Sequence, residues 1–214
     1  MQKARYHHGD LREALLIAAE ALLGESGVQG LTLRACARRA GVSHAAPKHH
    51  FRDVAELLSE VAARSFNKLT DKLAAARVAT GDDPDERFIA VARTYVQFAR
   101  DFPAHFRLMF RSDLLRRDNP ALMAAAAQTF SEMTNSITVQ RGEPEVTPDD
   151  LFARIAQPGL AADIFIGWSH IHGFAQLLLE GQLDAFGAAD DADEFVEAAI
   201  VNSGRRIAAL LRRG

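Results

Sequence analysis

Polar residues that can begin a helix recur along the whole chain ahead of hydrophobic segments, whereas strand signals do not. Asp83, for example, is followed by Pro84 and Glu86, so a cap, a first-turn proline and a capping-box carboxylate stand in order. Comparable groups begin at Asp10, Asp53, Asn119, Thr147 and Asp191. We therefore predict an all-α protein, with helices over about 10–26, 32–40, 44–50, 53–79, 84–101, 103–112, 119–140, 148–157, 159–182 and 191–212.

The segment 31–51 predicts two short helices joined by a tight turn, which is how a helix-turn-helix reader of DNA is built. Thr32 can cap the first helix, and Gly41 tolerates the left-handed backbone that a helix end commonly needs. Ser43 can then cap a second helix over 44–50. Short alanine-rich helix pairs with a glycine turn are also common in α-helical proteins that do not bind DNA, so the spacing alone leaves that alternative open.

Seven polar side chains of this motif are candidates for contacts with DNA. The two capping hydroxyls can also meet phosphate, as helix N-terminal amides do. The second helix has no apolar pattern of its own, which favours its polar side chains as contacts to bases or backbone. His50 can equally pack beside Phe51 at the helix end. The candidate DNA-binding residues are Thr32, Arg34, Ser43, His44, Lys48, His49 and His50.

Charge is unevenly distributed along the chain, whose net charge is −3. Residues 1–53 contain eight Lys and Arg against five Asp and Glu, a net charge of +3, and five of the eight histidines. The remainder carries 17 basic and 23 acidic residues, a net charge of −6. A positive field at one end can steer the protein toward phosphate, although a charge of this size also suits a solvated face. The same end includes a polar arm that can reach DNA or stay a free terminus: Arg5, Tyr6, His7 and His8.

The composition is that of a globular protein, with 214 residues, 48% of them hydrophobic and 25% charged. No run of about 18 apolar residues exists, and the N-terminus lacks the apolar stretch of a signal peptide. We therefore expect a cytoplasmic protein with no membrane segment. The single cysteine, Cys36, cannot form an internal disulfide and is expected to be a small buried packing residue rather than a redox sensor.

The first 60 residues resemble the DNA-binding head of the TetR-type transcriptional regulators. The family motif runs Thr-hydrophobic-x-x-x-Ala-x-x-Ala-Gly-Val-Ser and ends in His-Phe, and it is matched by Thr32, Ala37, Ala40, Gly41, Val42, Ser43, His50 and Phe51. Farther along the chain, three residues resemble the marks of one C-terminal subgroup, the Trp-His-Gly (WHG) subgroup: Trp168, His172 and Gly173. The resemblance implies a three-helix DNA-binding head over 1–52 and a helical effector-binding and dimerisation body over 53–214.

Three residues of the motif depart from the family pattern. Lys48 stands where an aromatic residue is usual, and Val54 stands where a lysine commonly grips phosphate. Lys48 can supply a charged donor instead, but Val54 cannot, so we assign no phosphate contact to it. Pro47 removes a first-turn N–H and is expected to shorten or tilt the second helix.

The body offers large apolar side chains on several helices rather than catalytic machinery. Such residues form core more often than ligand sites, and the family resemblance is what favours a pocket for a hydrophobic effector. His170 and His172 cannot clamp one metal ion, because two residues apart on a helix they point to different faces. We expect no enzyme activity, metal or cofactor. The candidate effector-binding residues are Phe98, Phe102, Phe106, Met109, Phe130, Met133, Trp168 and His172.

The last two predicted helices have the pattern of a dimer interface. The segment 161–179 is apolar on nearly every side and must be buried on more than one face. The last helix adds an apolar stripe, and two copies of the pair would make a four-helix contact, as the resemblance also implies. The stripe consists of Val196, Ala199, Ile200, Ser203, Ile207 and Leu210.

Together these patterns predict a homodimeric transcriptional regulator, which we expect to be a repressor released from a palindromic DNA operator by a small apolar effector. Dimerisation suits this function because a twofold protein reads two half-sites on one duplex face. The alternative is an effector-independent DNA-binding or architectural protein. An α-helical enzyme is a third possibility, favoured only if turnover survived deletion of residues 1–52. The sequence identifies neither the operator nor the effector.

Overall fold

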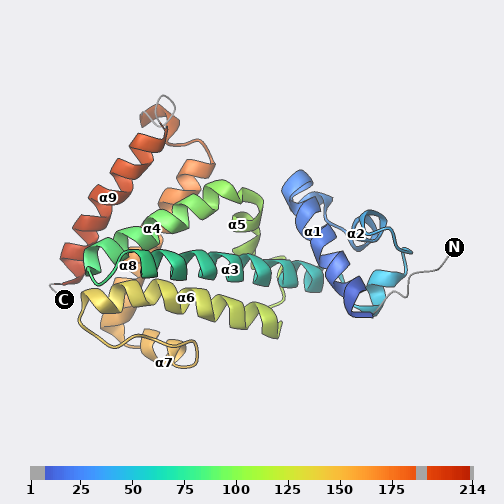
Figure 1. Ribbon diagram of the computed structural model, residues 1–214, viewed down its shortest axis with the longest axis horizontal. Coiled ribbons are helices and arrows are strands. Elements are labelled where there is room, and N and C mark those ends of the chain that lie inside the picture. The colour runs from blue at the N-terminus through green and yellow to red at the C-terminus, as the bar shows by residue number, and fades with distance from the viewer. Residues whose placement is uncertain (1–7, 187–191, 213–214) are drawn as a thin grey trace. The chain divides into compact units, whose positions relative to one another are not determined.

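The computed structural model describes residues 8–186 and 192–212, and every regular element in these ranges is helical (Figure 1). The predicted all-α fold is therefore confirmed. The arm residues Arg5, Tyr6 and His7 and the cap Asp191 lie outside the described residues. The elements are α1 His8–Gly30, α2 Leu33–Arg39, the 3₁₀ helix η1 Ala46–His49, α3 Val54–Ala79, α4 Pro84–Asp101, α5 Pro103–Met109, α6 Pro120–Gln140, α7 Leu151–Ile155, α8 Pro158–Leu179, the 3₁₀ helix η2 Asp184–Phe186 and α9 Ala192–Leu211.

The predicted capping residues explain where several helices begin. Oδ1 of Asp83 accepts hydrogen bonds from the backbone N–H groups of Asp85 at 2.9 Å and Glu86 at 3.2 Å. Asn119 caps α6 in the same way, with its Oδ1 2.9 Å from the backbone nitrogen of Leu122. These bonds satisfy N–H groups that have no partner inside the helix. Polar residues ahead of hydrophobic segments thus set the starts of both helices.

The first helix is interrupted at Gly27. Its φ of 66° and ψ of −173° are not helical, although α1 is continuous to Gly30 in its assigned bounds. Regular helix therefore ends at Ser26, where the sequence predicts the end. Gly27 accepts this conformation because it has no Cβ to clash with the neighbouring carbonyl.

The chain groups into two compact units. Unit 1 comprises residues 1–66 and 104–123, and unit 2 comprises 67–103 and 124–214. In unit 1, α1 packs on α2, and α2 packs on η1. Cys36 is fully buried there, as predicted, and burial raises the pKa of its thiol to about 11, which keeps it protonated and unreactive at neutral pH.

In unit 2, α4 packs against both α8 and α9, and α7 packs against α8 (Figure 1). One hydrophobic cluster joins α4, α6, α8 and α9, and burial of its side chains is the main favourable contribution to this packing. None of the helices in the described ranges is long and apolar enough to cross a membrane. The cluster consists of Phe88, Ile137, Leu160, Ala208 and Leu211.

Candidate functional site

The first helix of the predicted DNA-binding motif forms as expected. Oγ1 of Thr32 accepts a hydrogen bond from the backbone nitrogen of Ala35 at 3.1 Å and caps α2. Gly41 follows the helix with φ 69°, and the N–H of Val42 donates to the carbonyl of Ala37 at 3.0 Å. This left-handed glycine and the bond after it end the helix and turn the chain.

The second helix of the motif differs from the prediction of an α-helix over 44–50. It is the 3₁₀ helix η1, which begins two residues later, at Ala46. Pro47 lies within its first turn, buried, and has no N–H to donate. The carbonyl of Ser43 accepts from the backbone nitrogen of Ala46 at 3.0 Å, whereas no side chain caps η1. The expected shortening by proline is confirmed, and the expected cap by Ser43 is wrong.

Six of the seven candidate DNA-binding residues are exposed, and His50 is half-buried. The basic residues of this motif differ in whether they form an ion pair within the protein. Arg39 donates two hydrogen bonds to the carboxylate of Glu25, at 2.6 and 2.8 Å. Arg34, Arg38 and Lys48 form no ion pair within the described part of the chain. These three cations therefore remain available to phosphate.

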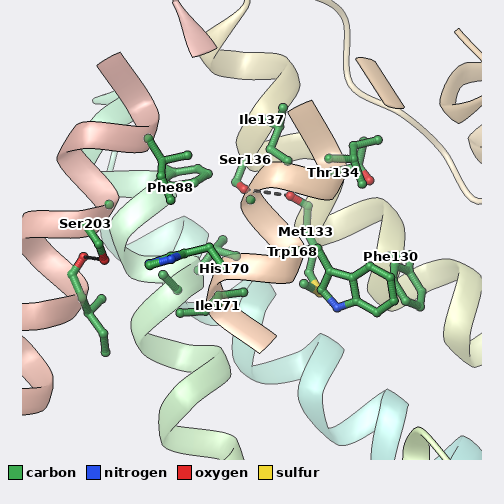
Figure 2. Close-up of a pocket in the computed structure, with 17 residues that line it drawn as sticks. Phe88, Phe130, Met133, Thr134, Ser136, Ile137, Trp168, His170, Ile171 and Ser203 are labelled. Carbon is green, nitrogen blue, oxygen red and sulfur yellow. Dashed lines mark hydrogen bonds between the residues drawn. The ribbon is translucent and has the colours of Figure 1, made fainter. Parts of the chain in front are cut away.

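Unit 2 contains a narrow cavity, partly open to solvent, between α4, α6, α8 and α9. Three of the predicted effector-binding residues line it: Phe130, Met133 and Trp168 (Figure 2). The sequence did not indicate the other members of the lining: Phe88, Val91, Ala92, Thr134, Ser136, Ile137, Ile164, Gly167, His170, Ile171, Ile200, Ser203, Gly204 and Ile207.

The remaining predicted effector-binding residues lie elsewhere. Phe106 and Met109 are buried in unit 1, where Phe106 contacts Phe110 with ring centroids 5.3 Å apart. Phe98 and Phe102 contact each other at 5.3 Å in unit 2 and do not line the cavity. Phe98, Phe106 and Met109 are buried, whereas Phe102 is half-buried and lies beneath the ammonium groups of Lys68 and Lys72.

His172 is also absent from the residues that line the cavity. It shares a face of α8 with Trp168, as predicted, with ring centroids 5.9 Å apart. Its Nδ1 lies 2.8 Å from the hydroxyl oxygen of Tyr95, a residue that is 1% exposed. Burial lowers the pKa of His172 and raises the pKa of Tyr95, so both groups are neutral at pH 7. The pair supports the aromatic wall formed by Trp168 and Phe130, whose ring centroids are 5.2 Å apart.

Two glycines inside helices were a sequence signal for the close helix packing around the cavity. Gly167 and Gly204 lie inside α8 and α9, where a glycine weakens a helix unless close packing requires it. A Cβ at Gly204 would come within 3.0 Å of a side-chain carbon of Ile89, so α9 approaches α4 at this point. His170 follows Gly167 by three residues, which places both residues on one face of α8. From the sequence we considered His170 only as a metal ligand.

Two models of known protein families match this chain. Residues 15–61 match the family model described as bacterial regulatory proteins, tetR family. Residues 88–202 match the model described as tetracyclin repressor-like, C-terminal domain, which spans more than half of the chain. The chain belongs to the TetR family. It is a transcription regulator with a helix-turn-helix DNA-binding domain, as the motif predicts. The search of curated proteins found no match.

Solved structures share the TetR fold over nearly the whole chain. A protein of unknown function from Rhodococcus sp. RHA1 is 29% identical, with a TM-score of 0.73 and coverage of 97% of this chain and 98% of that one. A TetR family transcription regulator from Marinobacter aquaeolei VT8 is 17% identical, with a TM-score of 0.58 and coverage of 93% and 95%. The multidrug binding protein EbrR, complexed with imidazole, is 20% identical, with a TM-score of 0.53 and coverage of 92% and 93%.

Proposed function

We propose that this TetR-family protein is a homodimeric repressor that leaves a palindromic operator when a small apolar effector binds unit 2. The observation that carries the proposal is the cavity, which is lined by Trp168, Phe130 and Met133 and by no charged side chain. A largely apolar cavity with few polar groups is the usual form of a small-molecule site. The multidrug binding protein EbrR, which shares the fold, supports an effector role for this half of the chain.

Exposed apolar residues on α8 support dimerisation. Phe165 is 62% exposed and Leu177 is 45% exposed, on the side of α8 opposite its buried residues Gly167 and Ile171. A large apolar surface on a single chain commonly marks an interface. Ile200, expected in the dimer stripe, is instead 3% exposed in the single chain and lines the cavity. The proposed seam is therefore the outer face of α8 with the exposed side of α9.

Effector binding would act through the spacing of the two heads. Half-sites on one face of DNA lie about 34–36 Å apart or at multiples of that distance, so a small change in head separation prevents both heads from fitting. A regulator of this kind acts in the cytoplasm, where bacterial DNA lies. The WHG subgroup assignment, from Trp168, His172 and Gly173, is part of this proposal and rests on those three residues.

A coupled binding assay tests the proposal. Small molecules that raise the melting temperature of the protein are collected and added to its complex with a DNA site selected from random fragments. Repressor function predicts that stabilising compounds release the DNA, because a ligand that favours one conformation shifts the equilibrium away from the other. If they stabilise the protein and leave DNA affinity unchanged, the alternative of an effector-independent DNA-binding protein holds.

A further inference from the structure

The cavity of unit 2 has two chemically different sides. Figure 2 shows the indole of Trp168 beside the ring of Phe130 on one side, and His170 on the α9 side, where Ser203 also lies. The indole and phenyl rings meet edge to face, with an interplanar angle of 85°. One side therefore offers aromatic surface, and the other offers the polar atoms of His170 and Ser203 beside the ring of Phe88.

The polar side can both accept and donate hydrogen bonds. The hydroxyl of Ser203 donates to the carbonyl of Ala199 at 2.6 Å, so its oxygen remains an acceptor toward the cavity. No hydrogen bond or ion pair engages His170 in the part of the chain that the structure describes. His170 is an exposed residue, and partial desolvation lowers the pKa of its ring, so the neutral form presents one N–H donor and one nitrogen acceptor.

Charge is absent from the cavity lining. None of its 17 residues is Asp, Glu, Lys or Arg. An ionic ligand would lose water and gain no opposite charge, which is unfavourable in an apolar site. A carboxylate could pair with His170 only if the imidazole took up a proton, and partial desolvation of that ring lowers its pKa and opposes protonation.

We propose that the cavity binds an uncharged, largely apolar compound that carries a hydroxyl group. The apolar part contacts Trp168 and Phe130, and the hydroxyl both donates to and accepts from the polar side formed by His170 and Ser203. A hydroxyl matches this side because it is a donor and an acceptor at once. The inference rests on the proposed effector site and specifies the ligand class for it.

Trp168 provides a direct readout, because it is the only tryptophan of the chain. Its emission is followed while purified protein is titrated with 1-octanol, octanoate or octylammonium, which share one alkyl chain and differ in the end group. We expect octanol to change the emission with a Kd at least about tenfold below those of both ions. An equal or lower Kd for either ion overturns the proposal, as does the absence of any response to octanol up to its solubility.

Two serines give a matched pair of variants. Ser203 and Ser169 both donate to backbone carbonyls of their own helices, but only Ser203 lines the cavity. We expect Ser203→Ala to weaken octanol binding several-fold and His170→Leu to weaken it about tenfold, with Ser169→Ala unchanged. Equal effects of the two serine variants, or no effect of His170→Leu in a protein that melts like the wild type, contradict the assigned polar side.

Release of DNA is measured separately, so that the two proposals can fail independently. If octanol binds with the expected preference and the operator stays bound, the ligand class stands and the repressor mechanism fails. If the operator is released by the octanoate or octylammonium ion and octanol has no effect, the effector response stands and the ligand class is wrong.

Discussion

Asp53 receives hydrogen bonds from two guanidinium nitrogens of Arg116, 63 residues farther along the chain, one of them at 3.3 Å. The backbone nitrogen of Arg116 also donates to the hydroxyl of Ser59 at 2.8 Å. The segment between α5 and α6 is thereby held against the first turns of α3 within unit 1. The hydrogen bond from Arg116, with a smaller contribution from the backbone N–H of Glu56, lowers the pKa of Asp53 to about 2.

This ion pair predicts a specific pH dependence of stability. A carboxyl whose pKa is lower in the folded protein than in the unfolded chain, where it is about 3.9, stabilises the fold above that unfolded value. The contribution is lost as the pH falls from about 4 to about 2. Asp53→Asn keeps a capping oxygen for Glu56 and removes the charge. We expect the variant to be less stable than the wild type at pH 6, and the difference to shrink as the pH falls.

Urea unfolding at pH 6, 4 and 3 measures this difference. Asp113→Asn is a suitable control, because its partner Arg111 is only two residues away and their ion pair joins no distant segments. A difference between Asp53→Asn and the wild type that does not change with pH would show that the lost charge is not the cause.

A second prediction concerns Lys48, the exposed lysine of η1. If it binds phosphate, Lys48→Ala should weaken binding to all DNA sequences and reduce the slope of log affinity against log salt by about one unit per head, or two per dimer. Lys72→Ala removes an exposed lysine of unit 2 and serves as the control. Anisotropy titrations at several salt concentrations give the slopes. An unchanged slope with altered base preference would mean that Lys48 reads bases.

The proposed dimer seam is tested by Phe165→Glu. Phe165 is exposed in the single chain, so the change should leave the protomer folded and place a charge in the apolar contact between copies. We expect monomers in sedimentation velocity and weak binding to DNA. Val78→Glu, at a residue that is 77% exposed near the end of α3, should remain dimeric. A dimeric Phe165→Glu protein with normal DNA affinity would place the seam elsewhere.

The pair of Tyr95 and His172 predicts a stability effect. His172→Phe removes the ring nitrogen that lies 2.8 Å from the buried hydroxyl of Tyr95, and should lower the free energy of unfolding by about 1–3 kcal/mol. Tyr95→Phe removes the other half of the pair. Urea unfolding of both single variants and the double variant completes the cycle, and we expect the double variant to lose less than the sum. Additive losses would show that the two side chains do not interact.

The sequence predicts those helix ends that depend on residues close together in the chain. Asp83 and Asn119 cap helices through their nearest neighbours in sequence, and Gly41 ends α2 through its own backbone freedom. The extent of η1 was harder to predict, because Pro47 shortens it by an amount that depends on the packing of the proline ring.

The cavity could be predicted only in part, because its lining comes from four helices. Trp168 and Phe130 stood out as large side chains, but equally large Phe98 and Phe106 pack into core. The sequence also does not reveal that Ile200 faces α4 within its own chain instead of a second copy, since the apolar stripe of α9 suits either neighbour. Such choices depend on contacts between distant segments.

The claim that the exposed helix-turn-helix motif reads a twofold DNA site can be checked by sequencing the genomic fragments that the purified protein retains. The control is a variant carrying both Arg34→Ala and Lys48→Ala, which removes two exposed cations of the motif without touching its core. We predict that the wild type enriches one inverted repeat, with half-site centres about 34–36 Å or a multiple of that distance apart, and that the variant does not. Recovery of unrelated fragments, or the same enrichment by both proteins, would contradict the claim.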